Sequence, residues 1–154
     1  MPSPEAVIKQ IQATGERMTI QRRLIVEALC AAAGHTSISD LQHWLQANYP
    51  AHELSDATIY RILQWLKNLE LVAQTDMGSA GIVYELLGQA YHHHLICLNC
   101  GRVFDLGDHY LAPLRQALAD DLKFQARIDH MAIYGLCADC AARQATEKSA
   151  QAPA

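Results

Sequence analysis

Three histidines and two cysteines stand close together in the stretch YHHHLICLNCG, residues 91–101, and a second cysteine pair follows in LCADC. Two thiolates spaced as CxxC can chelate one tetrahedral zinc ion, and two such pairs complete a four-thiolate site. A redox-active pair or incidental core thiols are the competing interpretation. The sequence shows no export signal, so we expect reduced thiols, which favours metal binding. The spacing predicts structural zinc at Cys97, Cys100, Cys137 and Cys140.

The histidines cannot easily serve the same ion as the cysteines if residues 91–97 form a strand. Side chains alternate along a strand, so His92 and His94 share one face while His93 and Cys97 share the other. A solvated, tag-like histidine run is the alternative. The neighbouring CxxC pair and the strand-forming residues favour two separate metal sites.

A pair of imidazoles needs further ligands to hold a divalent ion firmly. Glu85 in VYELL and Asp105 in VFDLG are the nearest carboxylates on either side of the histidine run. Mixed nitrogen and oxygen ligands suit iron, manganese, zinc or cobalt. The residue types therefore do not select one metal.

The elements that must position these residues change character along the chain. Capped, helically spaced apolar residues predict four helices in PEAVIKQIQATG, TIQRRLIVEALCAAAG, SISDLQHWLQANYP and SDATIYRILQWLKNLEL. In the second of these, Cys30 is expected to be a buried small side chain. Residues 71–87 hold two short apolar stretches around DMGSAG, which predicts a β-hairpin. Helices followed by a hairpin is the order of a winged helix-turn-helix.

The fourth predicted helix would be the recognition helix of such a fold. The first residues of a recognition helix reach base edges and phosphates in the major groove. A buried four-helix segment would look similar in sequence. The residues expected to contact DNA here are Ser55, Ala57, Thr58, Tyr60 and Arg61.

The second half of the chain alternates strands with a helix. HHHLICLNC, GRVFDLG and ARIDHMAIYGLC are strand-like, and YLAPLRQALADDLKF is helix-like. The predicted fold class is α+β. We expect a winged helix-turn-helix domain at 1–83, an α/β domain at 84–143 and a disordered tail at 144–154.

Composition excludes several classes of protein. The 154 residues are 51% hydrophobic and carry a net charge of −4 that divides evenly between the halves. This argues against a disordered chain and against broad non-specific nucleic-acid binding. No phosphate loop, nucleophile elbow or HExxH motif is present, and no apolar run approaches the ~20 residues that span a bilayer. We expect a cytoplasmic protein that is not an enzyme and has no membrane partner.

From about Gly15 to Cys140 the chain resembles the ferric uptake regulator family of bacterial metal-responsive repressors. The resemblance lies in GERMTIQRRLIVEAL, GHTSISDLQHWL, SDATIYRILQWLKNLELV, VYELLGQAYHHHLICLNCGRVFDL and IYGLCADC. The third stretch contains the Thr-x-Tyr-Arg core of the family's recognition helix. The order of these motifs along most of the chain makes the resemblance specific.

The resemblance implies a homodimer that binds a palindromic double-stranded DNA operator. A winged-helix domain would be joined to an α/β dimerisation domain by a hinge, expected near Asp76–Gly81, and Arg17 would contact DNA near the minor groove. The four paired cysteines would hold the structural zinc. A second divalent metal, Fe2+, Zn2+ or Mn2+, would regulate the protein from a site that joins the domains, at His35, Glu85, His92, His94 and Asp105.

Some positions depart from the family pattern. Many relatives have a further His–Asp–Glu–His site, whose positions here are Tyr91, His93, Ala112 and Asp129, or His130 if the strand shifts by one residue. That site is expected to be absent or altered, and a third metal site around His93 and His130 is left open.

The identity of the sensed metal is also left open by the sequence. Glu85 resembles the iron-sensing branch, the unbroken histidine run resembles the zinc-sensing branch, and Asp105 resembles the peroxide-sensing relatives. We expect a metal-responsive repressor with iron favoured, and a zinc-sensing or peroxide-sensing member as the alternative. A thiol redox sensor and a zinc hydrolase are the alternatives from other classes.

Overall fold

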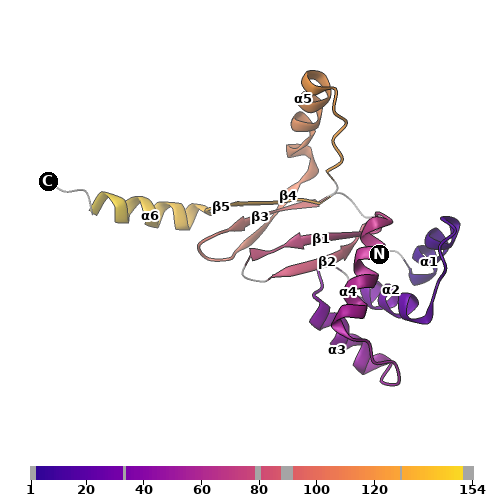
Figure 1. The fold of residues 1–154 in the computed structure, drawn as a ribbon. Coiled ribbons are helices and arrows are strands. Elements are labelled where there is room, and N and C mark those ends of the chain that lie inside the picture. Colours follow the sequence, from indigo (N-terminus) through magenta and orange to yellow (C-terminus); the bar gives the residue numbers. More distant parts are fainter. Residues whose placement is uncertain (1–2, 33, 79–80, 88–91, 129, 151–154) are drawn as a thin grey trace. The chain divides into compact units, whose positions relative to one another are not determined.

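The computed structural model describes residues 3–32, 34–78, 81–87, 92–128 and 130–150 (Figure 1). Two compact units emerge from the contacts within the chain. The first comprises Met1–Thr75 and Ile82–Ala90, and the second comprises Asp76–Gly81 and Tyr91–Ala154. None of the helices that the structure describes is both long and apolar enough to span a lipid bilayer.

Four helices and a two-stranded sheet make up the first unit. The elements are α1 (Pro4–Ala13), α2 (Ile20–Ala32), α3 (Ile38–Asn48), α4 (Asp56–Asn68), β1 (Val72–Asp76) and β2 (Ile82–Leu86). Side-chain oxygens accept hydrogen bonds from the first turns of the helices, as expected for N-caps. The capping residues are Ser3, Thr19, Ser37 and Ser55. The predicted helices and hairpin are therefore confirmed.

The apolar faces of these helices meet in one core. Ile11, Ile25, Ile59 and Leu63 are fully buried there, together with Tyr84 from β2. The spacing of buried residues in α4 at Ile59, Ile62, Leu63 and Leu66 is the helical pattern that buries one face and leaves the other to solvent. The exposed face of α4 is consequently available for a partner.

An isolated β-bridge ties the segment between α2 and α3 to the sheet. Thr36 and Tyr84 pair in antiparallel fashion, with N–O distances of 2.9 and 2.8 Å. In this pairing, residue 35 lies opposite residue 85. The bridge thus positions two residues, His35 and Glu85, that the sequence places far apart.

The second unit is built on a three-stranded sheet of order β4-β3-β5. Its elements are β3 (His92–Cys97), β4 (Val103–Gly107), the short 3-10 helix η2 (Asp108–Tyr110), α5 (Ala112–Leu122), β5 (Ala132–Gly135) and α6 (Ala138–Ala150). The central strand β3 is antiparallel to β4 and parallel to β5. Strands β3, β4 and β5 confirm the strand-like segments of the sequence, although β5 is shorter than predicted.

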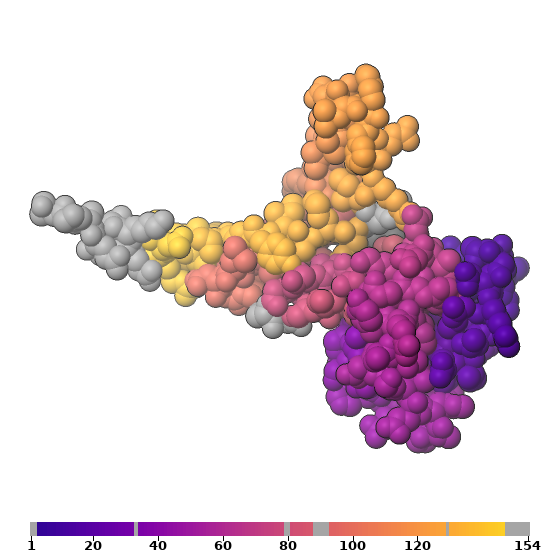
Figure 2. Space-filling model, viewed as in Figure 1, coloured from indigo at the N-terminus to yellow at the C-terminus, as the bar shows by residue number. Residues whose placement is uncertain are grey.

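The helices of the second unit leave one face of its sheet open. Helix α5 stands away from the strands, and α6 continues past the end of β5 (Figures 1 and 2). Leu95, Phe104 and Ile133 are neighbours across the three strands, and each is between 37% and 41% exposed. We call these three side chains the open apolar face. Among the described residues of this unit, the buried apolar side chains are Met77, Ile96, Cys97, Leu111 and Cys140.

The expected domain boundary differs from the way that contacts divide the chain. The boundary after residue 83 falls inside β2, and contacts group residues 82–90 with the first unit. The backbone nitrogen of Met77 lies 2.8 Å from the Gly81 oxygen, and contacts group residues 76–81 with the second unit. The hinge expected near Asp76–Gly81 stays a prediction.

The C-terminal segment is more ordered than its composition indicates. Helix α6 reaches Ala150, where the sequence predicted disorder from residue 144. Its alanines, together with Arg143, Glu147 and Lys148, have high helix propensity, and Asp139 lies in the favourable first turn. Residues 151–154 lie outside the described part of the chain.

Candidate metal centres and nucleic-acid surface

The two cysteine pairs converge at one end of the sheet. One Sγ atom from each of Cys97, Cys100, Cys137 and Cys140 lies within 4.8 Å of the others. The Cys100 and Cys137 sulfurs are 3.8 Å apart. Zinc–sulfur bonds of about 2.3 Å in a tetrahedron place sulfurs about 3.8 Å apart. The four residues therefore fit a tetrahedral zinc ion.

The sheet and two turns bring these sulfurs together. Cys97 ends β3, and the turn that follows it closes with a 2.9 Å hydrogen bond from the Gly101 nitrogen to the Cys97 oxygen. Gly101 has φ of 69°, a conformation that favours glycine. Cys97 pairs with Gly135 in the parallel register, so Cys137 emerges beside it. The Cys137 backbone N–H donates to the Cys97 sulfur at 3.4 Å.

The surroundings of the four thiols favour the thiolate form at Cys97 but disfavour it at Cys137. Hydrogen bonds from the backbone N–H groups of Cys137 and Cys100 lower the pKa of Cys97 to about 6. The Cys140 N–H acts to lower the pKa of Cys137, but desolvation and the neighbouring thiols outweigh it and raise that pKa to about 11. A divalent cation removes this conflict because it favours deprotonation of every sulfur that binds it.

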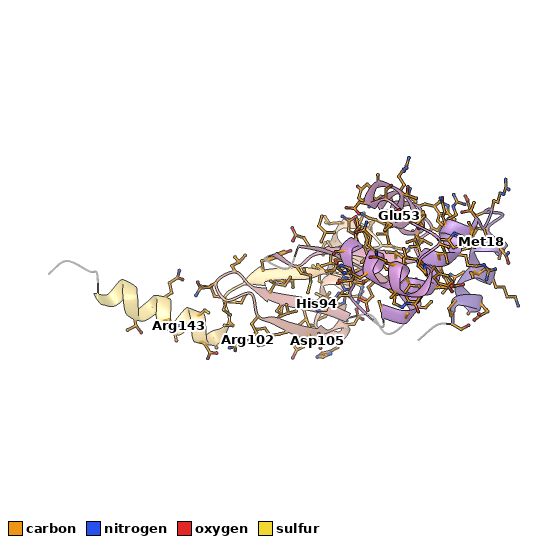
Figure 3. The ribbon with its side chains drawn as sticks, turned by 90° about the horizontal axis from the view of Figure 1, so that it is seen from below. Met18, Glu53, His94, Arg102, Asp105 and Arg143 are labelled. Carbon is orange, nitrogen blue, oxygen red and sulfur yellow. The ribbon has the colours of Figure 1, made fainter. Side chains whose placement is uncertain are left out.

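Two cations that the sequence did not single out lie beside the sulfurs. One of them is Arg143, whose Nη2 lies 3.0 Å from Cys140 Sγ. Hydrogen bonds from Asn99, the larger cause, and from Arg143 lower the pKa of the Cys140 thiol. Arg102 forms a 3.0 Å ion pair with Asp139 at the start of α6. Figure 3 shows Arg102 near the end of the sheet and Arg143 on α6. These guanidinium groups offset part of the negative charge of four thiolates.

The predicted regulatory residues form pairs within each unit. In the first unit, His35 Nε2 lies 3.2 Å from Glu85 Oε2, and the two side chains are 27% and 17% exposed. The antiparallel bridge between Thr36 and Tyr84 explains why they meet. One imidazole and one carboxylate therefore make half of a metal site.

The second unit contributes another imidazole–carboxylate pair. His94 on β3 is directly opposite Asp105 on β4, and His94 Nδ1 lies 3.6 Å from Asp105 Oδ1 (Figure 3). His94 is 3% exposed, whereas the Asp105 side chain is open to solvent. His92 begins the same strand, and its side chain lies outside the described part of the structure. The alternation expected for His92 and His94 stays a prediction.

His93 points to the opposite face and joins a hydrogen-bonded cluster. Its Nε2 lies 3.1 Å from Asp108 Oδ1, and it is fully buried. Arg115 on α5 binds both oxygens of Asp108 and also donates to the Ile128 carbonyl at 2.6 Å. The hydrogen bonds of Arg115 and then His93 lower the pKa of Asp108 to about 2.

This cluster occupies the region where the further site of some relatives was expected to be altered. Ala112 begins α5 and offers no ligand atom, while Tyr91 and Asp129 lie outside the described residues. Arg115 supplies a fixed positive charge to Asp108. His93 thus has a protein partner on its buried face.

Replacing Asp108 by Asn is expected to lower the thermal midpoint of the zinc-loaded protein at pH 7. The lowered pKa keeps Asp108 ionised in the folded state, so its contribution is present above about pH 4 and is lost as the pH falls toward 2. Differential scanning calorimetry at pH 7 measures the change. Asp120→Asn on the exposed side of α5 is the matched control and should leave the midpoint nearly unchanged; equal midpoints for both variants contradict the assigned role.

The residues expected to contact DNA lie at the start of α4 and before α2. Ser55 caps α4, and Ala57, Tyr60 and Arg61 are exposed. Arg61 Nε donates to the Ala57 carbonyl at 3.1 Å, which folds its guanidinium back along the helix. Thr58 is half-buried, with its hydroxyl 3.1 Å from Ser55 Oγ. Arg17 is also exposed, and its carbonyl accepts from Arg22 at 2.6 Å.

Comparison with known proteins identifies the chain's family. The model of the ferric uptake regulator family matches residues 13–134, most of the chain. The chain belongs to the ferric uptake regulator family. Its fold, α+β with an N-terminal helical unit, agrees with that of the Vibrio cholerae ferric uptake regulator. That structure is 27% identical with a TM-score of 0.62, over 84% of this chain and 98% of the other.

Curated relatives in the family include regulators of different signals. The chain is 29% identical to the ferric uptake regulation protein of Campylobacter jejuni over 140 residues, 91% of this chain and 89% of the relative. It is 28% identical to the peroxide operon regulator of Bacillus subtilis over 137 residues, 89% and 92% of the two chains. The ferric uptake regulator family consists of metal-responsive transcription regulators, so the prediction that this chain is not an enzyme is confirmed.

Several residues at these centres had little signal in the sequence. Asp108, Arg115 and Arg143 are common residue types in helical or turn sequence, and only the fold brings them to His93 and Cys140. His130 lies beside His94, with their Nε2 atoms 3.0 Å apart. The parallel pairing of β3 with β5 could have suggested this neighbour, had the register been known.

Proposed function

We propose that the protein is a homodimeric repressor that binds a pseudo-palindromic DNA operator when its regulatory site holds a divalent metal. The observation that carries the proposal is the division of ligand pairs between the units. His35 and Glu85 stand 3.2 Å apart in one unit, and His94 and Asp105 stand 3.6 Å apart in the other. Neither pair alone provides enough ligands for tight binding, whereas together with His92 they do.

The proposed switch follows from this division. A metal bound to ligands from both units supplies a link that favours one arrangement of the DNA-binding units. His35 and Glu85 contribute from the bridge region, and His92, His94 and Asp105 contribute from the sheet. Shifting an equilibrium from 1:99 to 99:1 requires ~5.5 kcal/mol of differential binding.

DNA recognition is assigned to the exposed N-terminal end of α4. Ala57 offers a methyl group for thymine contact, and Tyr60 and Arg61 can reach phosphates or base edges. Ser55 and Thr58 hold the helix start through their hydroxyls. Arg17 provides a further positive charge next to α2. The overall charge of −4 implies weak non-specific binding, so affinity depends on the arrangement of two recognition helices.

The dimer is assigned to the second unit. Its open apolar face exposes Leu95, Phe104 and Ile133 side by side, and its own buried core is small. A second copy would cover this face and supply the missing burial. Two-fold symmetry then predicts two DNA half-sites related by a dyad. We place the protein in the cytoplasm, where an operator is accessible.

We assign zinc to the four-cysteine site and leave the regulatory metal among iron, zinc and manganese. The relatives include proteins named for ferric uptake and for peroxide response, which supports either iron sensing or peroxide sensing through iron. Iron is the first candidate because Glu85 resembles the iron-sensing branch of the family. A zinc-sensing role would require that zinc occupy both kinds of site.

Footprinting with the zinc-loaded protein and Fe(II), Mn(II) or Zn(II) tests the proposal. At least one metal should produce protection of a sequence with dyad symmetry, and His94→Ala should abolish it while leaving one zinc per chain and a folded dimer. His52→Ala, an exposed histidine in the first unit, is the control. No metal-dependent protection of any genomic fragment, or a zinc-free wild-type protein with readily oxidised thiols, contradicts the repressor.

A further inference from the structure

We propose that His130 supplies an additional imidazole to the regulatory metal, which makes this site richer in nitrogen than the five expected ligands indicate. This inference rests on the proposed function, since it concerns the same site. It comes from the second unit alone, where His130 stands against His94. The inference gives His130 a place at that one ion, and it involves neither catalysis by His130 nor a second ion.

The register of the sheet explains why His130 reaches this place. His94 pairs with Ala132 in the parallel ladder, and the His94 nitrogen donates to the Met131 oxygen at 2.8 Å. His130 lies in a bend two residues before β5 begins, next to this pairing. Its ring there contacts the ring of His94.

The contact between the two rings has the geometry of converging ligands. The Nε2 atoms of His94 and His130 are 3.0 Å apart, the ring centroids are 4.8 Å apart, and the rings are tilted by 59°. Two imidazoles bound tetrahedrally at about 2.0–2.1 Å from a metal have nitrogens about 3.3–3.4 Å apart. If the two Nε2 atoms moved apart by a few tenths of an ångström, the ion would fit between them.

Asp105 and His130 face different nitrogens of the His94 ring. Asp105 Oδ1 lies 3.6 Å from His94 Nδ1, which is longer than a hydrogen bond, and His130 Nε2 lies 3.0 Å from His94 Nε2. An ion held between the two rings would therefore be bound through His94 Nε2. With the ion at this nitrogen, Asp105 acts on His94 by its charge from the other side of the ring, and His130 takes the ligand position expected for Asp105.

An added imidazole changes which cations the site prefers. Imidazole suits zinc, cobalt, nickel and iron, whereas manganese prefers oxygen ligands. With His35, His92, His94 and His130, nitrogen donors outnumber the carboxylates. We therefore infer a stronger preference for Zn(II) and Co(II) over Mn(II) than the five-ligand set alone would give.

Titration of the full-length, zinc-loaded protein with Co(II) tests this inference. His130→Asn should weaken binding of the second equivalent by at least about tenfold and alter the visible cobalt absorption bands, because a ligand is lost. It should also reduce the ratio of Co(II) to Mn(II) affinity. The matched control, His52→Asn, removes an exposed histidine of the first unit and should match the wild type. Structural zinc content and circular dichroism establish that each variant is folded.

The wild-type protein provides a second measurement that does not depend on a variant's folding. Binding of Zn(II) to the regulatory site should shift the His130 imidazole Nε2 resonance in a nitrogen-15 spectrum. Unchanged Co(II) affinity and bands in His130→Asn, with an unshifted His130 resonance, overturn the assignment of His130 while the regulatory site stands. Absence of a second bound equivalent in the wild type overturns both the site and the assignment.

Discussion

Replacing Cys100 by Ala is expected to release the structural zinc and to unfold the second unit, while the helices of the first unit remain. Structural zinc contributes about 10–16 kcal/mol of apparent binding free energy in small peptide sites, which exceeds the stability of most domains. The second unit has few buried apolar side chains of its own, so it has little to replace that energy. Atomic absorption gives the zinc content, and hydrogen exchange by mass spectrometry locates the unfolding.

Cys30→Ala is the matched control for this variant. Cys30 is the one cysteine outside the four-sulfur cluster, and it is buried in α2 within the core of the first unit. Burial is the main reason that the pKa of the Cys30 thiol is raised, as expected for an unreactive thiol in an apolar environment. This variant should keep one zinc per chain and native exchange in β3 and β5. If Cys100→Ala retained stoichiometric zinc and native exchange there, the four-thiolate site would be wrong.

The convergence of the four cysteines was predictable from the sequence because its signal is local. Each CxxC pair encodes a chelate by itself, and strand alternation separates Cys97 from His94 without any knowledge of the fold. The helices of the first unit were predictable for a similar reason. Ser37 and Ser55 are caps next to apolar residues at helical spacing, so propensity, pattern and capping agree.

Contacts that depend on strand register or on the packing of distant segments could not be predicted from the sequence. The approach of His35 to Glu85 needs the Thr36–Tyr84 bridge, and the resemblance to a family suggested that association where spacing could not. His130 meets His94 because the parallel pairing of β5 with β3 brings the bend before β5 next to His94.

Replacing Leu95 by Asp is expected to convert the proposed dimer into monomers at micromolar concentration. Leu95 is the central member of the open apolar face, with Phe104 on one neighbouring strand and Ile133 on the other. In a two-fold interface the substitution places a carboxylate in both copies. Removing an unpaired charge from water costs several kcal/mol per ion, so the dimer dissociation constant should rise by more than about a thousandfold. Sedimentation equilibrium measures it directly.

Ile82→Asp separates this effect from the general cost of an added charge. Ile82 lies in β2 of the first unit and is 49% exposed. Ile82→Asp therefore introduces the same carboxylate in place of an aliphatic side chain of equal size, at a position no less exposed than Leu95. It should leave the protein dimeric. Sedimentation of Leu95→Asp as a dimer with the wild-type dissociation constant would show that another surface forms the interface.

The Leu95 variant also separates assembly from metal binding. Its zinc site lies at the end of the sheet, and His94 and Asp105 lie on the opposite face from Leu95, so both should still bind metal. Each monomer presents one α4 helix and can occupy one half-site at a time. Operator affinity should therefore fall steeply while the stoichiometry of structural zinc stays at one per chain. The Cys100 variant loses both properties together, because its sheet no longer holds the face that pairs the two chains.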